Sequence, residues 1–377
     1  MSNNNNDNAV LREPSLPLHG ERTPEGQERG SVLRQPSSPS TGEDARRAGG
    51  GALAPSRGKM PEGQKGVRII FMGTPEFAVG TLSALVEGGY NVVAVVTQPD
   101  KPVGRHGSVL QPSQVKQYAL EHDIPVLQPV KMKEPEFVEQ LRSYNADLQV
   151  VVAFRMLPEI VWDMPRFGTF NVHAALLPQY RGAAPINWAV INGETRTGVT
   201  TFFLDHDIDT GRIIKQKPFD IPDDANVEYV YDGLMKLGAE LAIETVDAII
   251  AGNGNVESLP QEDMIPVGEE LHSAPKIFKE TCEIDWHKTV KQCHDFVRGL
   301  SPVPGSWTNV TLPDGRETVM KIYKAQKTDR KAEAPGTLHA EKNHLYISAS
   351  DYQLEILEVQ IAGKKRMAAR DFVNGLK

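Results

Sequence analysis

The stretch VRIIFMGTPEF, residues 67–77, joins a short apolar run to a turn and to the start of a helix. Within the turn, Thr74 is placed to cap a helix whose first residue is Pro75. Continuous apolar runs separated by helices predict a parallel sheet that is covered on both faces. We expect its strands over Val67 to Met72, Asn91 to Thr97, Leu148 to Ala153, Thr169 to His173 and Thr197 to Leu204.

Helical stretches lie between these runs, near residues 76–88, 113–122, 135–144 and 184–192. A long amphipathic helix follows over 227–249, where apolar residues recur at helical spacing and Gly252 stands just past the end. Ligands of such sheets bind beyond the carboxyl ends of the strands. The loops after residues 72, 97, 153 and 173 are therefore expected to surround one crevice.

The 377 residues divide by composition into four parts. Residues 1–65 contain no Phe, Trp or Tyr, so we predict a disordered tail. Residues 66–255 form the first folded domain, and residues 256–275 are a polar linker. In residues 276–377, short alternating runs are separated by turn sequences, which predicts a small, mostly β domain.

Composition narrows the function classes. No run of 18 apolar residues occurs, so no membrane-spanning helix is expected. Cys282 and Cys293 are the only cysteines, and without a secretory signal we expect a cytoplasmic protein. The net charge is −8, yet residues 276–377 carry 17 Lys and Arg against 13 Asp and Glu. This excess is consistent with contact to a polyanion and equally with a solvated surface.

Common cofactor motifs are missing. The first strand is followed by Gly73 alone and not by the GxGxxG of dinucleotide sites. The run from Asp205 to Asp209 imitates the start of a calcium loop, but Thr210 replaces the required Gly and Gln216 the required Glu. We therefore expect no metal site.

The candidate catalytic residues are Asn171, His173 and Asp209. Residues two apart on a strand point to the same face, so Asn171 and His173 address one point of the crevice. A carboxamide and an imidazole can stabilise a developing oxyanion, and the imidazole can carry a proton. Asp209 follows the strand ending at Leu204, is expected at the same edge of the sheet, and would orient the ring. The alternative is that all three only cap backbone groups.

The segment NVHAALLPQYRGAAP, residues 171–185, together with Asp209-Thr-Gly211, resembles the folate-dependent formyltransferases. Residues 66–377 as a whole are most similar to the methionyl-tRNA formyltransferases. The resemblance implies an α/β fold: a Rossmann-like formyltransferase domain with a small C-terminal β-barrel (OB-like) domain. Supporting segments are Phe71 to Phe77, Gln98 to Arg105, Ser113 to Lys116, Arg298 to Pro302 and Ala362 to Arg366.

The resemblance also implies an activity. The family transfers the formyl group of 10-formyltetrahydrofolate to the amino group of methionyl initiator tRNA for translation initiation, without a metal. Asn171 and His173 would stabilise the tetrahedral oxyanion, while Asp209 would hold His173. The family's folate-binding Ser-Leu-Leu-Pro corresponds to Ala175, Leu176, Leu177 and Pro178, so alanine replaces the serine. A Tyr-Gly pair common in the family is replaced by Phe154-Arg155.

For the tRNA, the resemblance points to the loop from about Gln98 to Pro112, which would enter the groove of the acceptor arm. Arg105 and Lys101 are its basic candidates, and Lys364, Lys365 and Arg366 form a candidate phosphate patch in the C-terminal domain. A solvated loop and a solvated turn are the alternatives. We expect a monomer that does not bind membranes.

Three other functions are considered. A formyltetrahydrofolate hydrolase would carry a regulatory domain before the catalytic one, and residues 1–65, which lack aromatic residues, cannot be that domain. Phosphoribosylglycinamide formyltransferases share the three catalytic residues but normally lack a C-terminal β domain, so residues 276–377 disfavour that reading. A non-catalytic module that binds folate or tRNA would not need a proton shuttle. The intact Asn171, His173 and Asp209 therefore favour an enzyme.

Overall fold

The computed structural model describes residues 66–103, 109–265, 268–313 and 315–376. The predicted tail, residues 1–65, and the candidate Arg105 lie outside the described residues.

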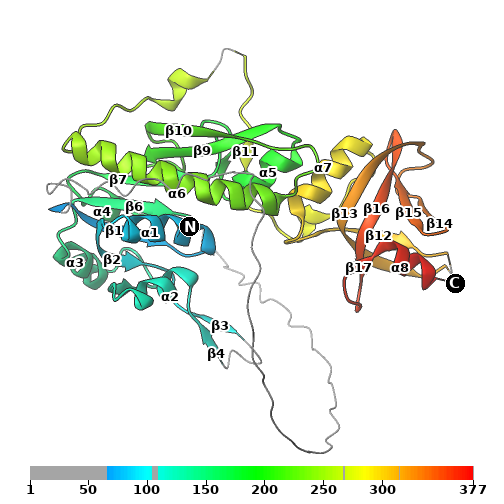
Figure 1. Cartoon of the computed structure of the whole chain (residues 1–377), viewed down its shortest axis with the longest axis horizontal. Helices are drawn as coiled ribbons and strands as arrows, with labels where there is room; N and C mark the ends of the chain where they lie inside the picture. Colours follow the sequence, from blue (N-terminus) through cyan, green and yellow to red (C-terminus); the bar gives the residue numbers. More distant parts are fainter. Residues whose placement is uncertain (1–65, 104–108, 266–267, 314, 377) are drawn as a thin grey trace, which may run out of the picture. The chain divides into compact units, whose positions relative to one another are not determined.

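The N-terminal part is built on a sheet in the order β10-β9-β7-β6-β1-β2-β5 (Figure 1). Five neighbouring strands, from β7 to β5, are parallel. A second, antiparallel sheet forms the C-terminal part, so the fold class predicted from the sequence is confirmed. The strands of the first sheet are β1 (Arg68–Gly73), β2 (Asn91–Val96), β5 (Val126–Leu127), β6 (Leu148–Val152), β7 (Thr169–His173), β9 (Arg196–Phe203) and β10 (Ile213–Asp220).

Strand β9 differs from the expectation because it runs antiparallel to β7, with Phe203 opposite Phe170. For β9 to lie parallel to β7, the connection between them would have to cross back along the full length of the strand. The only helix between the two strands is α5 (Pro185–Ile191), whose 7 residues span about 10 Å. The expectation that β9 ends at the same edge as His173 is therefore wrong.

Helices cover both faces of this sheet, as expected. Alternate residues of β1 enter different cores: Ile69 and Phe71 pack with α1 and α6, whereas Ile70 and Met72 pack with α3 and α4. Figure 1 shows α6 running along the sheet beside α1. The helices are α1 (Glu76–Glu87), α2 (Gln114–Glu121), α3 (Pro135–Ser143), α4 (Glu159–Trp162) and α6 (Val227–Ala251), with Gly252 at the C-terminal cap of α6.

The predicted cap at Thr74 is wrong. Helix α1 begins at Glu76 with Pro75 as its N-cap residue, and no side chain caps it. The Thr74 hydroxyl is buried without a hydrogen-bond partner. Proline fits the position because the missing N–H would be unpaired there in any case.

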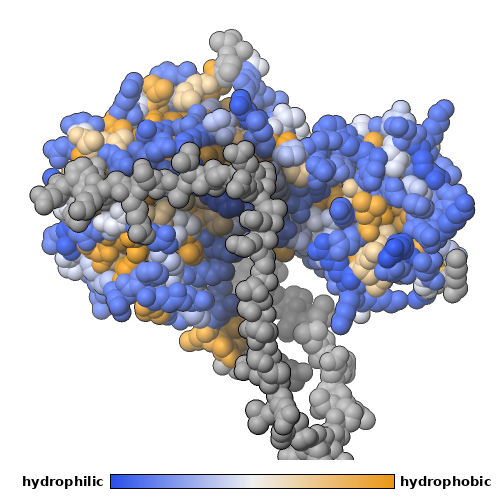
Figure 2. Space-filling model, viewed as in Figure 1, coloured by the Kyte–Doolittle hydropathy of each residue, from blue (hydrophilic) through white to orange (hydrophobic). Residues whose placement is uncertain are grey.

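The loop expected between β2 and α2 contains a hairpin of β3 (Lys101–Val103) and β4 (Val109–Gln111). Its apolar side chains are exposed, with Val109 at 58% and Leu110 at 64%. Figure 2 shows an apolar group where Figure 1 places β3 and β4. Asp100 lies at the base of the hairpin. Its carboxylate accepts hydrogen bonds from Lys116 at 2.6 Å and from Gln128 at 2.8 Å, and these two bonds hold the base in place.

The C-terminal part is an antiparallel sheet in the order β12-β13-β16-β15-β14, with β17 beside β16. Its core includes Met320, Ile347 and Ile356, which pack against helices at both ends of the segment. The elements are α7 (Val290–Leu300), β12 (Ser306–Thr311), β13 (Glu317–Lys331), β14 (Leu338–Glu341), β15 (His344–Ser348), β16 (Tyr352–Ile361), β17 (Met367–Ala368) and α8 (Ala369–Asn374).

Helix α7 joins the two sheets through polar contacts. Arg298 donates to the carbonyl oxygen of Ala225 at 3.0 Å, and Asn187 of α5 donates to that of Gly299 at 2.8 Å. Arg298 also contacts Asp295 at 2.8 Å, and both side chains are nearly inaccessible to solvent. Because α5 begins at Pro185 and Asn187 lines the candidate cavity, these contacts connect α7 to one wall of the candidate site.

Candidate active site

A cavity of about 870 Å³ opens where β6 and β7 end, and it is lined by Asn171, His173 and Asp209 together. Gln98 after β2, Phe154 after β6 and Lys276 also line it. The structure thus brings the three candidate catalytic residues to one cavity.

His173 lies between two oxygen atoms. Its Nδ1 is 3.7 Å from Asp209 Oδ2, and its Nε2 is 2.9 Å from the carbonyl oxygen of Tyr180. The ring is 6% exposed. Only Nε2 is within hydrogen-bonding distance of its oxygen, so the ring is anchored through that nitrogen.

Asp209 reaches His173 from the loop that follows β9, although β9 ends opposite the start of β7. Its backbone is left-handed, with φ +56°, and its Oδ2 accepts from the Gly182 N–H at 3.0 Å. Gln261, which is fully buried, donates to the Asp209 carbonyl at 2.8 Å. Gly182 itself tolerates no side chain, because a Cβ would lie 2.4 Å from the Ala274 oxygen.

Asn171 supplies an unpaired amide oxygen to the cavity. Its Oδ1 is buried and has no hydrogen-bond partner among the described residues. An unsatisfied buried acceptor costs free energy unless a ligand pairs with it. The carboxamide is therefore suited to binding a substrate that brings an N–H donor.

The candidate folate-binding segment lies behind the cavity wall. Ala174 lines the cavity, whereas Ala175 and Leu177 are buried and Leu176 lines a second cavity. Thr200 fixes this segment, since its hydroxyl donates to the Ala175 carbonyl at 2.7 Å and accepts from the Leu177 N–H at 3.0 Å. Replacement of the family's serine by Ala175 leaves these backbone contacts in place.

If the segment binds the donor that the resemblance implies, Thr200→Val should raise the KM for 10-formyltetrahydrofolate several-fold. It should also lower the free energy of unfolding by about 1–3 kcal/mol, because two buried backbone groups lose their partner. Donor-dependent kinetics and urea unfolding measure the two effects. Thr201→Val is the matched control, since Thr201 is equally buried but bonds Thr245. The same rise in KM in both variants would contradict a role of the segment in donor binding.

The Phe154-Arg155 pair forms part of the cavity wall. Arg155 donates to the carbonyl oxygen of Val130 at 2.8 Å and also to that of Pro129. Partial burial lowers the pKa of Arg155 from its usual value. The arginine thus ties the segment after β5 to the wall.

The candidate tRNA-binding residues differ in how free their side chains are to contact a ligand. Lys101 is exposed on β3, and Lys364 and Lys365 are exposed next to each other. Arg366 is engaged, since it makes two hydrogen bonds with Glu358 at 2.6 and 2.7 Å and lies 4.2 Å from the ring centre of Tyr323. The two lysines therefore have more freedom to meet a phosphate than the arginine has.

Sequence reasoning missed three residues that hold the site: Tyr180, Gln261 and Thr200. Tyr180 acts through a main-chain carbonyl, which any residue type would supply. Gln261 lies within the stretch expected to be a polar linker, and Thr200 looks like an ordinary strand residue. None of the three carries a sequence signal of its own.

Two further classes of site were sought in the described part of the chain. No group of three or more His, Cys, Asp or Glu side chains is placed there to hold a metal ion. No helix within the described ranges combines the length and apolar character needed to cross a membrane.

Comparison with known proteins identifies the family. The family model described as formyl transferase matches residues 67–246, and the model of the formyl transferase C-terminal domain matches residues 276–377. The methionyl-tRNA formyltransferase of Parabacteroides distasonis is 58% identical over 313 residues, which are 82% of this chain and 96% of that protein. The enzyme of Porphyromonas gingivalis strain W83 is 46% identical over 312 residues, 82% of this chain and 95% of that protein. The chain belongs to the methionyl-tRNA formyltransferase family.

Solved structures similar to this methionyl-tRNA formyltransferase family member share its fold. The sugar 3N-formyltransferase WlaRD, crystallised with dTDP and 5-N-formyl-THF, has a TM-score of 0.57 at 20% identity, covering 79% of this chain and 99% of WlaRD. HypX from Aquifex aeolicus in complex with tetrahydrofolic acid has a TM-score of 0.54 at 18% identity, covering 82% of this chain and 47% of HypX.

Proposed function

We propose that this chain transfers the formyl group of 10-formyltetrahydrofolate to the amino group of methionine on initiator tRNA. The observation that carries the proposal is the convergence of Asn171, His173 and Asp209 on one cavity, with His173 held between a carboxylate and a carbonyl. The identity of 58% to a methionyl-tRNA formyltransferase supports the choice of acceptor.

In the proposed reaction the methionyl nitrogen attacks the formyl carbon, and the carbonyl electron pair moves to the oxygen. The new oxyanion receives a hydrogen bond from the Asn171 amide and, once His173 has taken the amine proton on Nδ1, a second one from that Nδ1–H. When the intermediate collapses, the bond from the formyl carbon to N10 of the folate breaks, the amine loses a proton and N10 gains one. His173 carries the proton, since Tyr180 engages Nε2 and leaves Nδ1 for the reacting groups.

Asn171 and Asp209 complete this scheme. The unpaired Oδ1 of Asn171 is suited to accept from the attacking N–H, while the NH₂ group of the same amide donates to the oxyanion. Asp209, 3.7 Å from Nδ1, favours the imidazolium that forms when His173 takes the proton.

The acceptor is tested by competition. The full chain is given 10-formyltetrahydrofolate with methionyl initiator tRNA, free methionine, glycinamide ribonucleotide and dTDP-3-aminofucose at equal concentrations. We expect formylation of the charged tRNA alone. The amino sugar is included because an N-formyltransferase from Helicobacter canadensis was crystallised with it and folinic acid. That structure has a TM-score of 0.55 at 19% identity, covering 80% of this chain and 100% of the other chain. Transfer to the ribonucleotide or the sugar would overturn the tRNA assignment and keep the chemistry.

We also propose that Lys364 and Lys365 contact tRNA phosphates. Replacing both by alanine should reduce the slope of log K against log salt by about 2, because each phosphate contact releases counterions. Filter binding of methionyl initiator tRNA measures the slope. The salt concentration is varied between about 50 and 200 mM, because phosphate contacts weaken strongly over this range. Lys131→Ala with Lys133→Ala, two exposed lysines of the catalytic part, is the control. An unchanged slope in the first variant would contradict the contact.

We infer that the enzyme works in the cytoplasm as a monomer. All three candidate catalytic residues come from one chain and line one cavity, so the chemistry needs no second copy. The proposed acceptor, a charged initiator tRNA, is a substrate of cytoplasmic translation.

A further inference from the structure

We propose that Tyr180 is a positioning residue that sets the tautomer of His173. Its carbonyl accepts from His173 Nε2, and its side chain, anchored away from the active cavity, holds that carbonyl in place. The inference rests on the proposed function and adds a residue that acts through His173 without touching the substrates.

The tautomer follows from hydrogen-bond chemistry. A carbonyl oxygen can only accept, so the nitrogen 2.9 Å from it must carry a hydrogen. Which nitrogen of a histidine is protonated is set by the bond that the other nitrogen makes. With Nε2–H fixed on Tyr180, the neutral ring has its lone pair on Nδ1, next to Asp209. Nδ1 is thus the atom that gains and loses the proton.

The backbone of Tyr180 is strained to present this carbonyl. Its φ is +61°, in the left-handed region that bulky residues rarely adopt. Such a conformation persists only where the surroundings fix it, and it is typical of functional sites. Asp209, on the other side of the ring, has a left-handed backbone as well, so both partners of His173 are held in strained conformations.

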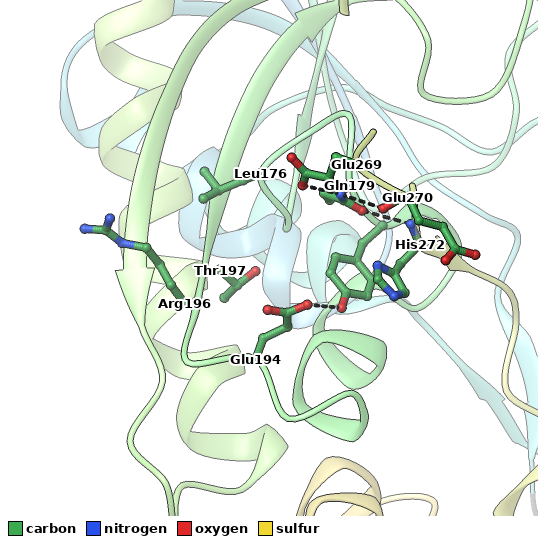
Figure 3. A pocket seen from close by; sticks show the side chains of 9 residues that line it. Leu176, Gln179, Glu194, Arg196, Thr197, Glu269, Glu270 and His272 are labelled. Carbon is green, nitrogen blue, oxygen red and sulfur yellow. Dashed lines mark hydrogen bonds between the residues drawn. The ribbon is translucent and has the colours of Figure 1, made fainter. Parts of the chain in front are cut away.

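Four contacts hold Tyr180. Its N–H donates to the His272 carbonyl at 2.7 Å, and its hydroxyl donates to Glu194 at 2.6 Å and accepts from Asn192 at 3.2 Å. Its ring stacks on His272 with centres 5.7 Å apart. Figure 3 labels Glu194 and His272, and one dashed line ends on the Glu194 carboxylate, which accepts from the Tyr180 hydroxyl. Burial and the bond to Glu194 raise the pKa of Tyr180, so the hydroxyl keeps its proton.

The side chain of Tyr180 does not line the cavity that contains Asn171, His173 and Asp209. It lines a second cavity, of about 310 Å³, together with Leu176, Glu194 and His272 (Figure 3). A change at the hydroxyl therefore removes no group from the cavity in which the catalytic residues meet. Any effect on turnover has to pass through the carbonyl and His173.

The test compares variants of the full chain. Tyr180→Phe removes the hydroxyl, Glu194→Leu removes its acceptor, and Glu194→Gln keeps an acceptor oxygen. Tyr90→Phe is the matched control, because the Tyr90 hydroxyl also bonds a carboxylate at 2.6 Å, that of Asp247, far along the chain from His173. We measure kcat and KM for both substrates, and record the ¹⁵N spectrum of histidine-labelled protein, with His173→Ala identifying the His173 signal.

We expect Tyr180→Phe and Glu194→Leu each to lower kcat about 10-fold, the scale of one hydrogen bond that fixes a catalytic group. The double variant should lose no more than either single one, both KM values should stay within about twofold, and Glu194→Gln should retain most of the activity. The His173 spectrum should change from the Nε2–H tautomer to a mixture in Tyr180→Phe and remain unchanged in Tyr90→Phe.

The proposal is overturned if Tyr180→Phe and Tyr90→Phe give the same kcat and the same His173 spectrum, or if losses in the double variant are additive. Should Tyr180→Phe fail to fold, Glu194→Leu against Glu194→Gln makes the same comparison. A wild-type chain that formylates no acceptor would overturn the proposed function alone, since the tautomer is recorded without turnover.

Discussion

Replacing His173 by alanine is expected to lower kcat by about 10²- to 10³-fold, the loss typical of removing one donor to an oxyanion. The ring is buried between Asp209 and Tyr180 and lines the cavity, so no neighbouring group is placed to substitute for it. The KM for 10-formyltetrahydrofolate should change little, because the proposed role of His173 develops in the transition state. Steady-state kinetics of formyl transfer to methionyl initiator tRNA give both numbers.

His122→Ala is the control for this prediction. His122 is exposed at the end of α2 and stacks on Tyr118, outside the candidate site. Its kcat should equal that of the wild type within about twofold, the usual effect of a surface change. A His173→Ala enzyme that binds the donor and turns over at the wild-type rate would refute the mechanism.

Arg298→Met is expected to lower the free energy of unfolding by about 3–5 kcal/mol, because it leaves the buried Asp295 carboxylate without its best partner. Asp295 is 2% exposed and Arg298 5%, and Arg298 also holds the Ala225 carbonyl across to the catalytic part. Lys291, 2.7 Å from Asp295, is more than half exposed and compensates weakly. Urea unfolding at pH 7 measures the difference.

Two controls separate burial from charge. Arg142→Met breaks an ion pair with Glu139 whose side chains are 50% and 71% exposed, so it should cost less than about 1 kcal/mol. Combining Arg298→Met with Asp295→Leu removes the uncompensated charge and should recover part of the loss. If Arg298→Met cost no more than Arg142→Met, the buried pair would not stabilise the fold.

The same pair predicts a pH dependence. Burial would raise the pKa of Asp295, but His294, Lys291 and Arg298 outweigh it and lower the pKa to about 2. A carboxyl with a depressed pKa in the folded state stabilises above its unfolded value, about 3.9, and this contribution is lost as the pH falls toward 2. The stability difference between wild type and Arg298→Met should therefore be full at pH 7 and shrink below about pH 4 in urea titrations. A difference independent of pH would contradict the assignment to Asp295.

Features of the fold that depend on the pattern of side chains along the chain could be predicted from the sequence. Apolar runs predicted four of the five parallel strands, β1, β2, β6 and β7, and helical spacing predicted α6 and its end at Gly252. The fifth, β5, has only two residues and was missed, whereas the remaining predicted strand is the antiparallel β9. The i, i+2 spacing of Asn171 and His173 placed both on one face. By contrast, β10 was not predicted because its central Lys-Gln-Lys is polar, as an edge strand permits, and only packing decides that such a segment pairs with β9.

Asp209 is the instructive case. The sequence placed it near His173 on the argument that β9 ends at the same edge of the sheet, but β9 is antiparallel and ends at the other. The loop brings Asp209 to His173 with the help of Gly182 and Gln261, contacts that depend on tertiary structure. Tyr180 could not be predicted at all, because its contribution is a main-chain oxygen in a strained conformation.

The most direct measurement of the central claim follows the labelled formyl carbon in a single turnover of the full chain. 10-[¹⁴C]Formyltetrahydrofolate and methionyl initiator tRNA are mixed with excess enzyme, the ester is hydrolysed, and the released products are separated. We predict one labelled N-formylmethionine for each tetrahydrofolate formed, and none with His173→Ala in the same time. Label that appears as free formate, or that stays on the folate while methionine remains unmodified, would contradict the account.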